Sequence, residues 1–302
     1  MMTFLPHPRP LLVNLGALCL SLLTLGLVIG APDRADRAKL DRPVMLDSNS
    51  PGSELFVLDA SGSLHKLRVA QDRLEEYGRF SLPAGFTAAD MAYSLSDGQE
   101  SLLIAGSESG RGVVVRYSLD GRRMKAWGFR NICSGIDFGV ATHSAYVATS
   151  DSNEIYRVDL QGTGIKYVTR IAFATKLGPV ALDEARQEIY VADVASGRIY
   201  QYLIATKAAK VLVNDFSAPT ALAFDSETGQ LFVADPGRRA ILSVNTRSNQ
   251  QVAAEFASDP LKAPYGVTLI SQGRIAVADY RANGVLVFSS KGRLLLRFPE
   301  IP

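Results

Sequence analysis

The stretch Leu231-Phe232-Val233-Ala234-Asp235 decides the fold, because related stretches occur six times along the chain. The last residues of successive copies are 47, 43, 44, 42 and 44 positions apart. A fixed period of this size is typical of repeat architectures, in which each repeat is one supersecondary unit. The other copies are residues 55–59 (LFVLD), 102–106 (LLIAG), 145–149 (AYVAT), 189–193 (IYVAD) and 275–279 (IAVAD).

The repeat around this stretch predicts four short strands, at residues 219–225, 231–235, 241–245 and 252–256. Gly, Asp, Asn and Ser residues separate these β-branched and aromatic runs, which is typical of antiparallel hairpins. A phenylalanine recurs 19 to 24 residues after each copy, and we expect it to pack between neighbouring sheets. These phenylalanines are Phe80, Phe129, Phe173, Phe216, Phe256 and Phe298.

Six repeats of four strands fill residues 43–302 and predict an all-β, six-bladed β-propeller. A linear β-solenoid is the alternative architecture. The first repeat begins with its own strand, Val44-Met45-Leu46, and the last repeat ends with its own strand at residues 294–298. We therefore expect the ring to close by blade packing, without an exchange of strands between the first and last blades.

The repeats resemble NHL repeats, in which a Pro-x-Gly-Ile-Ala-Val-Asp pattern precedes a Tyr-Val-Ala-Asp strand and a later Arg-Ile pair. Residues 221–225 and 264–267 match the first part, and residues 189–193 with 197–199 match the second. Gly106 and Thr149 depart from the pattern where Asp is expected, and Glu154 stands where Arg is expected. The resemblance implies a six-bladed propeller without specifying its function. Gluconolactonase-like and strictosidine-synthase-like propellers are related alternatives.

The N-terminal region predicts a membrane or export segment. Residues 11–31 are almost wholly apolar and long enough to cross a bilayer as a helix. We expect residues 1–31 to form a signal anchor or a cleaved signal peptide, and residues 32–42 to form a polar linker. The basic residues after the apolar run favour a cytoplasmic C-terminal side, whereas export is the usual role of such segments. We expect a membrane-anchored or secreted protein with the propeller outside the cytoplasm.

Composition gives little reason to expect a nucleic-acid partner. Lys plus Arg is 32 and Asp plus Glu is 30, for a net charge of +2. Nucleic-acid binders usually carry a concentrated basic face. The two cysteines, Cys19 and Cys133, lie in different regions and are not expected to form a disulfide. We interpret Cys133 as a small buried residue.

Candidate functional residues lie where the chain enters the innermost strand of each blade, since function usually collects on that face of a propeller. Two positions further along these strands, alignment of the six copies places one residue of each blade around the axis. These residues are Met45, Ala92, Asp137, Ala181, Ala223 and Thr268. The predicted ligand-binding residues at the mouth are Arg42, Asp90, Ser134, Asp137, Thr220 and Tyr265.

Two functions follow from these residues. Arg and Tyr are good anchors for a partner, so the first is a binding or scaffold module for a protein, peptide or glycan, without a cofactor or catalytic residues. The second is a metal-dependent hydrolase or lyase, which the gluconolactonase-like resemblance implies, with calcium or zinc held by Asp90 and Asp137. His65 and His143 are interpreted as surface residues. The recurring Asp59, Asp193, Asp235 and Asp279 are interpreted as caps of their own loops.

Overall fold

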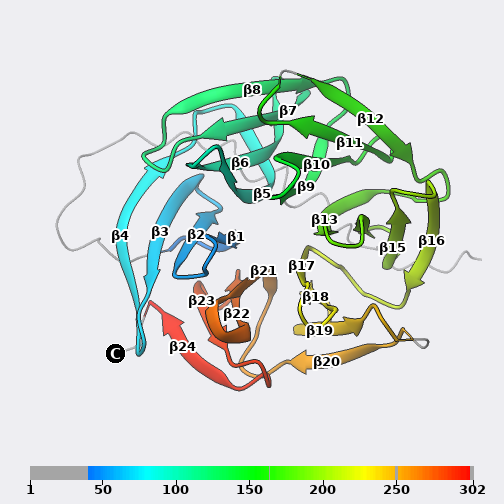
Figure 1. The fold of residues 1–302 in the computed structure, drawn as a ribbon. Helices are drawn as coiled ribbons and strands as arrows, with labels where there is room; N and C mark the ends of the chain where they lie inside the picture. Colours follow the sequence, from blue (N-terminus) through cyan, green and yellow to red (C-terminus); the bar gives the residue numbers. More distant parts are fainter. Residues whose placement is uncertain (1–39, 163, 249–250, 300–302) are drawn as a thin grey trace, which may run out of the picture. The chain divides into compact units, whose positions relative to one another are not determined.

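The computed structural model describes residues 40–162, 164–248 and 251–299, which form an all-β ring of six four-stranded antiparallel sheets (Figure 1). Each sheet is one blade and contains four consecutive strands. The strands of blades 1 to 3 are β1 (Pro43–Ser48), β2 (Glu54–Asp59), β3 (Ser63–Val69), β4 (Leu74–Ser81), β5 (Phe86–Ser96), β6 (Gln99–Glu108), β7 (Arg111–Tyr117), β8 (Arg123–Phe129), β9 (Cys133–Gly139), β10 (Ser144–Thr149), β11 (Glu154–Asp159) and β12 (Ile165–Arg170).

Blades 4 to 6 follow the same order, with one short 3₁₀ turn, η2 (Ser271–Gly273), between two strands of blade 6. Their strands are β13 (Leu177–Asp183), β14 (Glu188–Asp193), β15 (Arg198–Leu203), β16 (Ala208–Val213), β17 (Ala221–Asp225), β18 (Gln230–Asp235), β19 (Ala240–Asn245), β20 (Ala253–Ala257), β21 (Pro264–Ile270), β22 (Arg274–Asp279), β23 (Gly284–Phe288) and β24 (Leu294–Phe298).

The first strand of each blade lies nearest the axis, and the fourth lies on the perimeter (Figure 1). Innermost strands of neighbouring blades contact each other around the whole ring, including β1 of blade 1 with β21 of blade 6. No strand is exchanged between blades in the described chain, because every sheet contains its own four strands. The predicted six-bladed propeller and its closure by packing are therefore confirmed.

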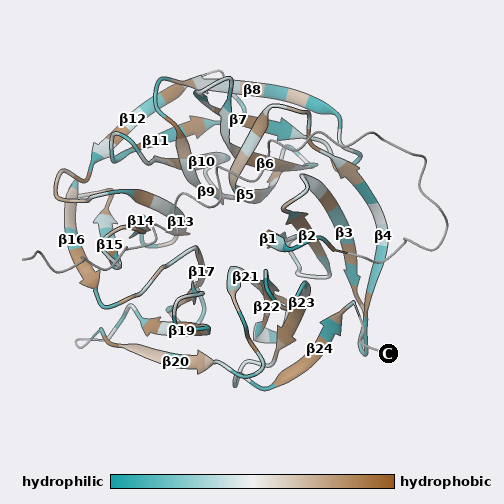
Figure 2. Cartoon of the chain, turned by 180° about the vertical axis from the view of Figure 1, so that it is seen from behind, coloured by the Kyte–Doolittle hydropathy of each residue, from teal (hydrophilic) through white to brown (hydrophobic). Residues whose placement is uncertain are grey.

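The hydrophobic core is divided into six layers, one between each pair of neighbouring blades. Alternation along a strand produces this division, since successive side chains point to opposite faces. In β2, Leu55 and Val57 pack against blade 6, whereas Phe56 and Leu58 pack against blade 2. Perimeter strands β4, β8 and β12 instead mix hydrophilic with hydrophobic residues (Figure 2). The second strand of a blade is thus apolar on both faces, because a neighbouring blade covers each face.

The recurring phenylalanines pack between neighbouring blades, and one of them is half exposed. Phe80, Phe129, Phe256 and Phe298 lie in fourth strands and contact the layer shared with a neighbouring blade, and Phe216 does so from the loop after β16. Phe173 follows β12 and is 54% exposed, with one ring edge against Tyr200 at 5.2 Å between centroids.

The recurring aspartates cap loops, as their repetition predicts. Asp193 accepts hydrogen bonds from the backbone N–H groups of Thr175, Lys176, Ala195 and Ser196. One carboxylate thereby joins the loop that enters a blade to the loop after its second strand. Asp235 and Asp279 bind the corresponding N–H groups in blades 5 and 6. These carboxylates are fully buried and occupied by the fold.

The predicted N-terminal segment of residues 1–31 and most of the predicted linker lie outside the described residues. Within the part that is described, no helix is long and apolar enough to cross a membrane. Leu40 is fully buried and packs between blades 6 and 1 with Leu46 and Val285. The chain is therefore packed into the propeller from Leu40 onward.

Candidate functional site

The mouth is the end of the ring formed by the loops that enter the innermost strands and the loops that leave the second strands. At the junction of blades 6 and 1 it carries a cation and two aromatic rings. The Arg42 guanidinium lies 5.7 Å from the Tyr280 ring centroid, within cation–π range. Tyr280 in turn lies beside Tyr265 of β21, with 5.2 Å between ring centroids. The structure thus brings together two predicted mouth residues, Arg42 and Tyr265, through a third that was not predicted.

Arg42 is held in an uncommon backbone conformation, with a φ of 55°. Its backbone N–H donates to Asn283 Oδ1 at 2.6 Å, across the closure of the ring, and its carbonyl accepts from the Ala60 N–H at 3.1 Å. Its side chain forms an ion pair with Asp41 at 3.0 Å, which raises the pKa of the guanidinium. Ten other described non-glycine residues, including Asn283, also have a positive φ, so this conformation is shared with other loops of the fold. Arg42 is a candidate contact because of its charge and its place beside Tyr280.

Asp90 and Asp137 lie within innermost strands, and each joins its blade to the next. Asp90 Oδ2 accepts from the Ile136 N–H at 2.9 Å, and Asp137 Oδ2 accepts from the Leu182 N–H at 2.7 Å. The other oxygen of each carboxylate accepts from the backbone of the following residue, Met91 or Phe138. All four carboxylate oxygens are therefore already hydrogen-bonded to the fold.

A third aspartate, Asp47 in β1, makes the same kind of bridge. Its Oδ2 accepts from the Tyr93 N–H at 2.6 Å, and its Oδ1 accepts from the Thr268 hydroxyl at 2.9 Å. The prediction placed Met45 at this register position, which is wrong by two residues. Asp47 pairs with Phe56 in β2, as Asp137 pairs with Tyr146 in β10, three residues before the end of each second strand. The same register shift occurs at the start of β5 and β21, so Asp47 follows Pro43 by four residues, as Thr268 follows Pro264. The prediction aligned the start of β1 two residues too early.

The three bridging aspartates have raised pKa values. Burial is the main cause, and it raises the pKa of Asp90 to about 8 and that of Asp137 to about 7, against the effect of their backbone hydrogen bonds. Burial also raises the pKa of Asp47. Neighbouring negative charges add to this effect, since Asp137 and Asp47 both raise the pKa of Asp90, and Asp47 raises that of Asp137. The axis therefore carries carboxyl groups that bind protons near neutral pH.

Ser134 and Thr220 occupy equivalent places in blades 3 and 5. The Ser134 hydroxyl donates to the Ala148 carbonyl at 3.3 Å, and the Thr220 hydroxyl donates to the Ala234 carbonyl at 3.4 Å. Both acceptors are the next-to-last residue of a second strand. Their shared bond is a property of the repeat, and neither hydroxyl joins the cluster around Arg42 and Tyr280.

No group of three or more His, Cys, Asp and Glu side chains that could hold a metal ion occurs among the residues that the structure describes. Asp90 and Asp137 would need a third protein ligand, because cation sites of this kind usually use several oxygen donors. Cys133 is fully buried, and burial raises the pKa of its thiol to about 12. A thiol in this state is unsuited to nucleophilic chemistry.

His65 is not a surface residue, contrary to the prediction, since it is only 1% exposed. Its Nε2 lies 3.0 Å from Asp59 Oδ2, and its Nδ1 lies 2.9 Å from Glu76 Oε1. It occurs in β3 and pairs with Val57 of β2, so it faces the layer between blades 6 and 1. The equivalent positions in the other blades carry Val115, Tyr156, Tyr200, Leu242 and Leu286.

Comparison of the six copies could have identified some of the residues that were missed. Tyr280 directly follows the copy that ends at Asp279, and it is the one aromatic at that place. The other copies are followed by Ala60, Ser107, Ser150, Val194 and Pro236. His65 is likewise the one histidine at a position that is otherwise apolar. The pairing of His65 with Glu76 needs the register of β3 and β4, which the sequence does not show.

No family model matches the chain, and none of the curated proteins does. Solved structures of similar fold include a chain of a nidogen/laminin complex, at 16% identity and a TM-score of 0.62, covering 78% of this chain and 94% of that one. Virginiamycin B lyase from Staphylococcus aureus has 12% identity and a TM-score of 0.61, covering 87% of this chain and 85% of that one. A luciferin-regenerating enzyme has 11% identity and a TM-score of 0.61, covering 82% and 86%.

Identities this low show the fold alone. They place the chain among β-propellers and leave the NHL resemblance a prediction. Since these neighbours include enzymes as well as a chain from a complex, the fold fits a binding module without excluding catalysis.

Proposed function

We propose that the propeller is a binding or scaffold module that captures a protein, peptide or glycan through the mouth. The observation that carries this proposal is the cluster of Arg42, Tyr280 and Tyr265 at the junction of blades 6 and 1. Tyrosine offers a large contact area with few rotatable bonds, and arginine offers several hydrogen-bond donors in a rigid, planar group. Both residue types contribute much of the binding energy at many interfaces. We extend the proposal to a membrane-tethered or exported protein on the basis of residues 11–31.

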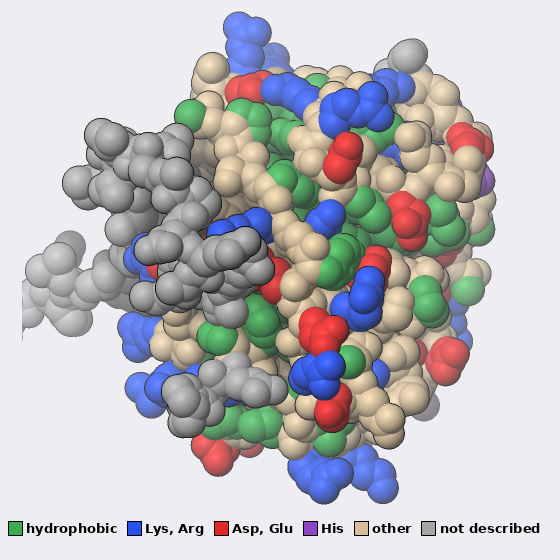
Figure 3. All heavy atoms as spheres, turned by 90° about the vertical axis from the view of Figure 1, so that its left-hand side faces the viewer, with side chains coloured by type: hydrophobic (Ala, Val, Ile, Leu, Met, Phe, Trp, Pro, Cys, Tyr) green, Lys and Arg blue, Asp and Glu red, His purple; other side chains and the backbone are tan. Residues whose placement is uncertain are grey.

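The surface charges support a partner that is neither nucleic acid nor strongly acidic. On the side of the molecule that Figure 3 shows, basic and acidic side chains alternate among hydrophobic ones. The mouth has the same mixed character, because Arg42 is paired with Asp41, and Arg238 is paired with Asp215. A surface of mixed charge favours a partner that is recognised by shape complementarity and hydrogen bonds.

A screen of the full chain against immobilised peptides and glycans tests this proposal. Arg42→Ala and Tyr280→Ala should each weaken capture of the selected ligands by at least tenfold, since truncation of a hot-spot residue removes about 2 kcal/mol or more. Tyr167→Ala is the matched control, because Tyr167 is 58% exposed on the perimeter strand β12. Ligands that bind both mouth variants as tightly as the unchanged chain would refute the proposed site.

The alternative of a metal-dependent hydrolase is tested by metal analysis of the purified full chain. One calcium or zinc ion per chain, removed by a chelator and absent from Asp90→Ala and Asp137→Ala variants, would establish a metal site at the axis and favour that function instead. The hydrogen-bonded state of both carboxylates is the observation against it.

A further inference from the structure

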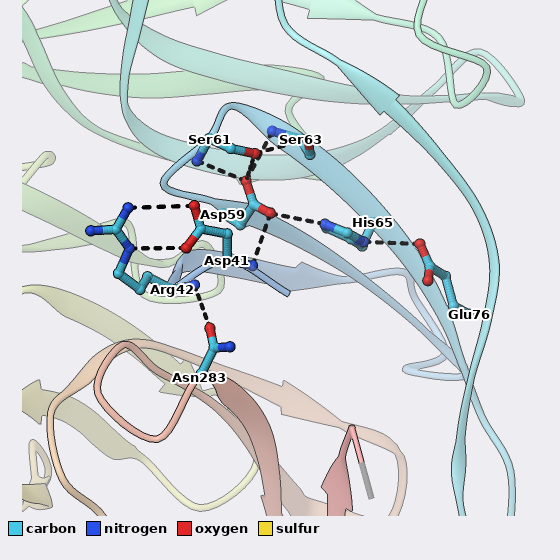
Figure 4. Close-up of polar contacts among 8 residues, drawn as sticks. All are labelled: Asp41, Arg42, Asp59, Ser61, Ser63, His65, Glu76 and Asn283. Atoms are coloured by element: carbon cyan, nitrogen blue, oxygen red, sulfur yellow. Dashed lines mark hydrogen bonds and ion pairs between the residues drawn. The ribbon is translucent and has the colours of Figure 1, made fainter. Parts of the chain in front are cut away.

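The junction of blades 6 and 1 contains a buried network of three ionisable side chains, and no other blade repeats it among the described residues. Figure 4 shows its residues: the imidazole of His65 lies between the carboxylates of Asp59 and Glu76. The side-chain exposures are 2% for His65, 3% for Asp59 and 10% for Glu76. When the imidazole is protonated, each ring nitrogen donates to one carboxylate, and the network of these three side chains carries one positive and two negative charges.

Asp59 connects the Asp59–His65–Glu76 network to the mouth through a single oxygen atom. Its Oδ1 accepts from the backbone of Ser61 and Ser63 and so holds its own hairpin. Its Oδ2 accepts from His65 Nε2 at 3.0 Å and from the Asp41 N–H at 3.2 Å. The next residue is Arg42, whose N–H is held by Asn283. His65 and the loop that carries Arg42 therefore share one acceptor atom.

The surroundings of His65 favour its protonated form. Burial lowers the pKa of His65, but the hydrogen bonds and charges of Asp59 and Glu76 outweigh burial, so its pKa is raised. Burial raises the pKa of Asp59, but the hydrogen bonds that it accepts from His65, Ser61, Ser63 and Asp41 outweigh burial, so its pKa is lowered. Two cations lie on the elements packed nearby: Arg79 pairs with His65 across β3 and β4, and Arg297 of β24 donates to the Ala282 carbonyl at 3.3 Å. The charges acting on His65 are those of its two carboxylate partners.

We propose that His65 is a pH-responsive latch that holds the Arg42 loop in place while its imidazole is protonated and releases it when the imidazole becomes neutral. A neutral imidazole carries one N–H, so one of the two carboxylates faces a ring nitrogen lone pair. Glu76 Oε2 has no hydrogen-bond partner and is buried, so the junction has little means of accommodating a second unpaired carboxylate. Once Asp59 Oδ2 loses its hydrogen bond to His65 Nε2, the carboxylate moves and its bond to the Asp41 N–H weakens. The loop then shifts and displaces Arg42 from Tyr280.

The latch regulates the site named under the proposed function and rests on that function for its biological meaning. The pH-dependent release of the Arg42 loop does not require any bound ligand. Hydrogen exchange of the free full chain therefore tests it separately. If the latch fails and mouth binding succeeds, the site is unregulated. If the latch succeeds and mouth binding fails, the junction titrates but binds nothing there.

The test follows protection factors, which remove the intrinsic pH dependence of exchange, from about pH 6 to about pH 9. In the unchanged chain, peptides covering residues 41–46 and 281–287 should lose protection by roughly tenfold as pH rises, because a tenfold population change accompanies each pH unit near a titration. The internal control is the loop of residues 175–180. Asp193 holds that loop through the same two kinds of bond, and Tyr200 replaces His65 there.

Two variants keep the proposal falsifiable. His65→Gln should abolish the pH dependence in residues 41–46. Glu76→Gln keeps an acceptor for the ring N–H but removes a charge, so the midpoint of the protection change should move to lower pH. A midpoint unchanged in Glu76→Gln, or a loss of protection that is equal in residues 175–180, would overturn the latch, even if His65→Gln failed to fold.

Discussion

Replacement of Asp235 by alanine measures what a repeated cap contributes to one blade. The carboxylate is fully buried and accepts from the N–H groups of Ser217 at 2.8 Å, Ala218 at 3.0 Å and Arg238 at 3.3 Å. Alanine leaves the Ser217 and Ala218 N–H groups without their acceptor, whereas the Arg238 N–H keeps its bond to the Asp235 carbonyl at 3.1 Å. Each buried unsatisfied donor costs about 1–3 kcal/mol. These two donors are partly accessible to water, so we expect the free energy of unfolding to fall by about 2–4 kcal/mol. Folded domains of ordinary stability have about 5–15 kcal/mol in total.

Urea denaturation of the full chain provides the measurement, with an unchanged m-value as the sign that the folded state is retained. Asp235→Asn should lose about 2 kcal/mol, because one oxygen still accepts while the amide NH₂ opposes a backbone N–H. Glu255→Ala in the same blade is the control, since Glu255 is exposed and such substitutions usually change stability by about 0.5 kcal/mol or less. A loss below about 1 kcal/mol in Asp235→Ala would refute the reasoning that these caps hold the blade loops.

Three further predictions concern the axis, the core and the free thiol. Because the pKa of Asp90 is raised to about 8, the folded chain binds a proton that the unfolded chain releases, so stability should fall as pH rises from about 4 to about 8. Asp90→Asn should flatten that slope in denaturation series across this range; an identical slope would contradict it. Leu55→Ala should cost about 2–5 kcal/mol, since Leu55 is fully buried, and a loss below about 1 kcal/mol would show a loosely packed junction. Cys133 should resist thiol labelling in the native chain, and peptide mapping that finds it modified without denaturant would contradict its burial.

The fold was predictable from the sequence because its information is repeated. Each copy of the Leu231–Asp235 pattern carries the same alternation of side chains, and six copies allow the blade to be read even where one departs from the pattern. Gly106 illustrates such a departure: a Cβ there would lie 2.0 Å from the Thr87 carbonyl oxygen, so blade 2 has no room for the aspartate found in other blades. A local exception of this kind does not disturb the period.

The candidate site was only partly predictable, because it depends on contacts between distant parts of the chain. Arg42 and Tyr265 follow from their place at the ends of innermost strands. Asn283 and Arg42 are 241 residues apart and meet only because the ring closes. The exact register of β1 also matters: Pro43 pairs with Asp59, as Pro264 pairs with Asp279, and this pairing places Asp47, and not Met45, at the position of Thr268. Side-chain direction near a bulge is not determined by residue spacing alone.

The concentration of unrepeated residues at one junction has a physical reason. A ring without strand exchange closes through packing, side chains and isolated backbone bonds, because no backbone ladder crosses from blade 6 to blade 1. One such bond joins the Ser271 N–H to the Gly52 carbonyl at 3.3 Å. Thr268 reaches Asp47 and the Ser48 hydroxyl reaches the Leu269 carbonyl at 2.6 Å, each across more than two hundred residues. Bonds of this kind can open without unfolding a blade, because each blade keeps its own sheet and most of its layers. The closure is therefore the place in this fold where a change in a few side chains, such as Arg42 and His65, can alter the mouth while the blades remain intact.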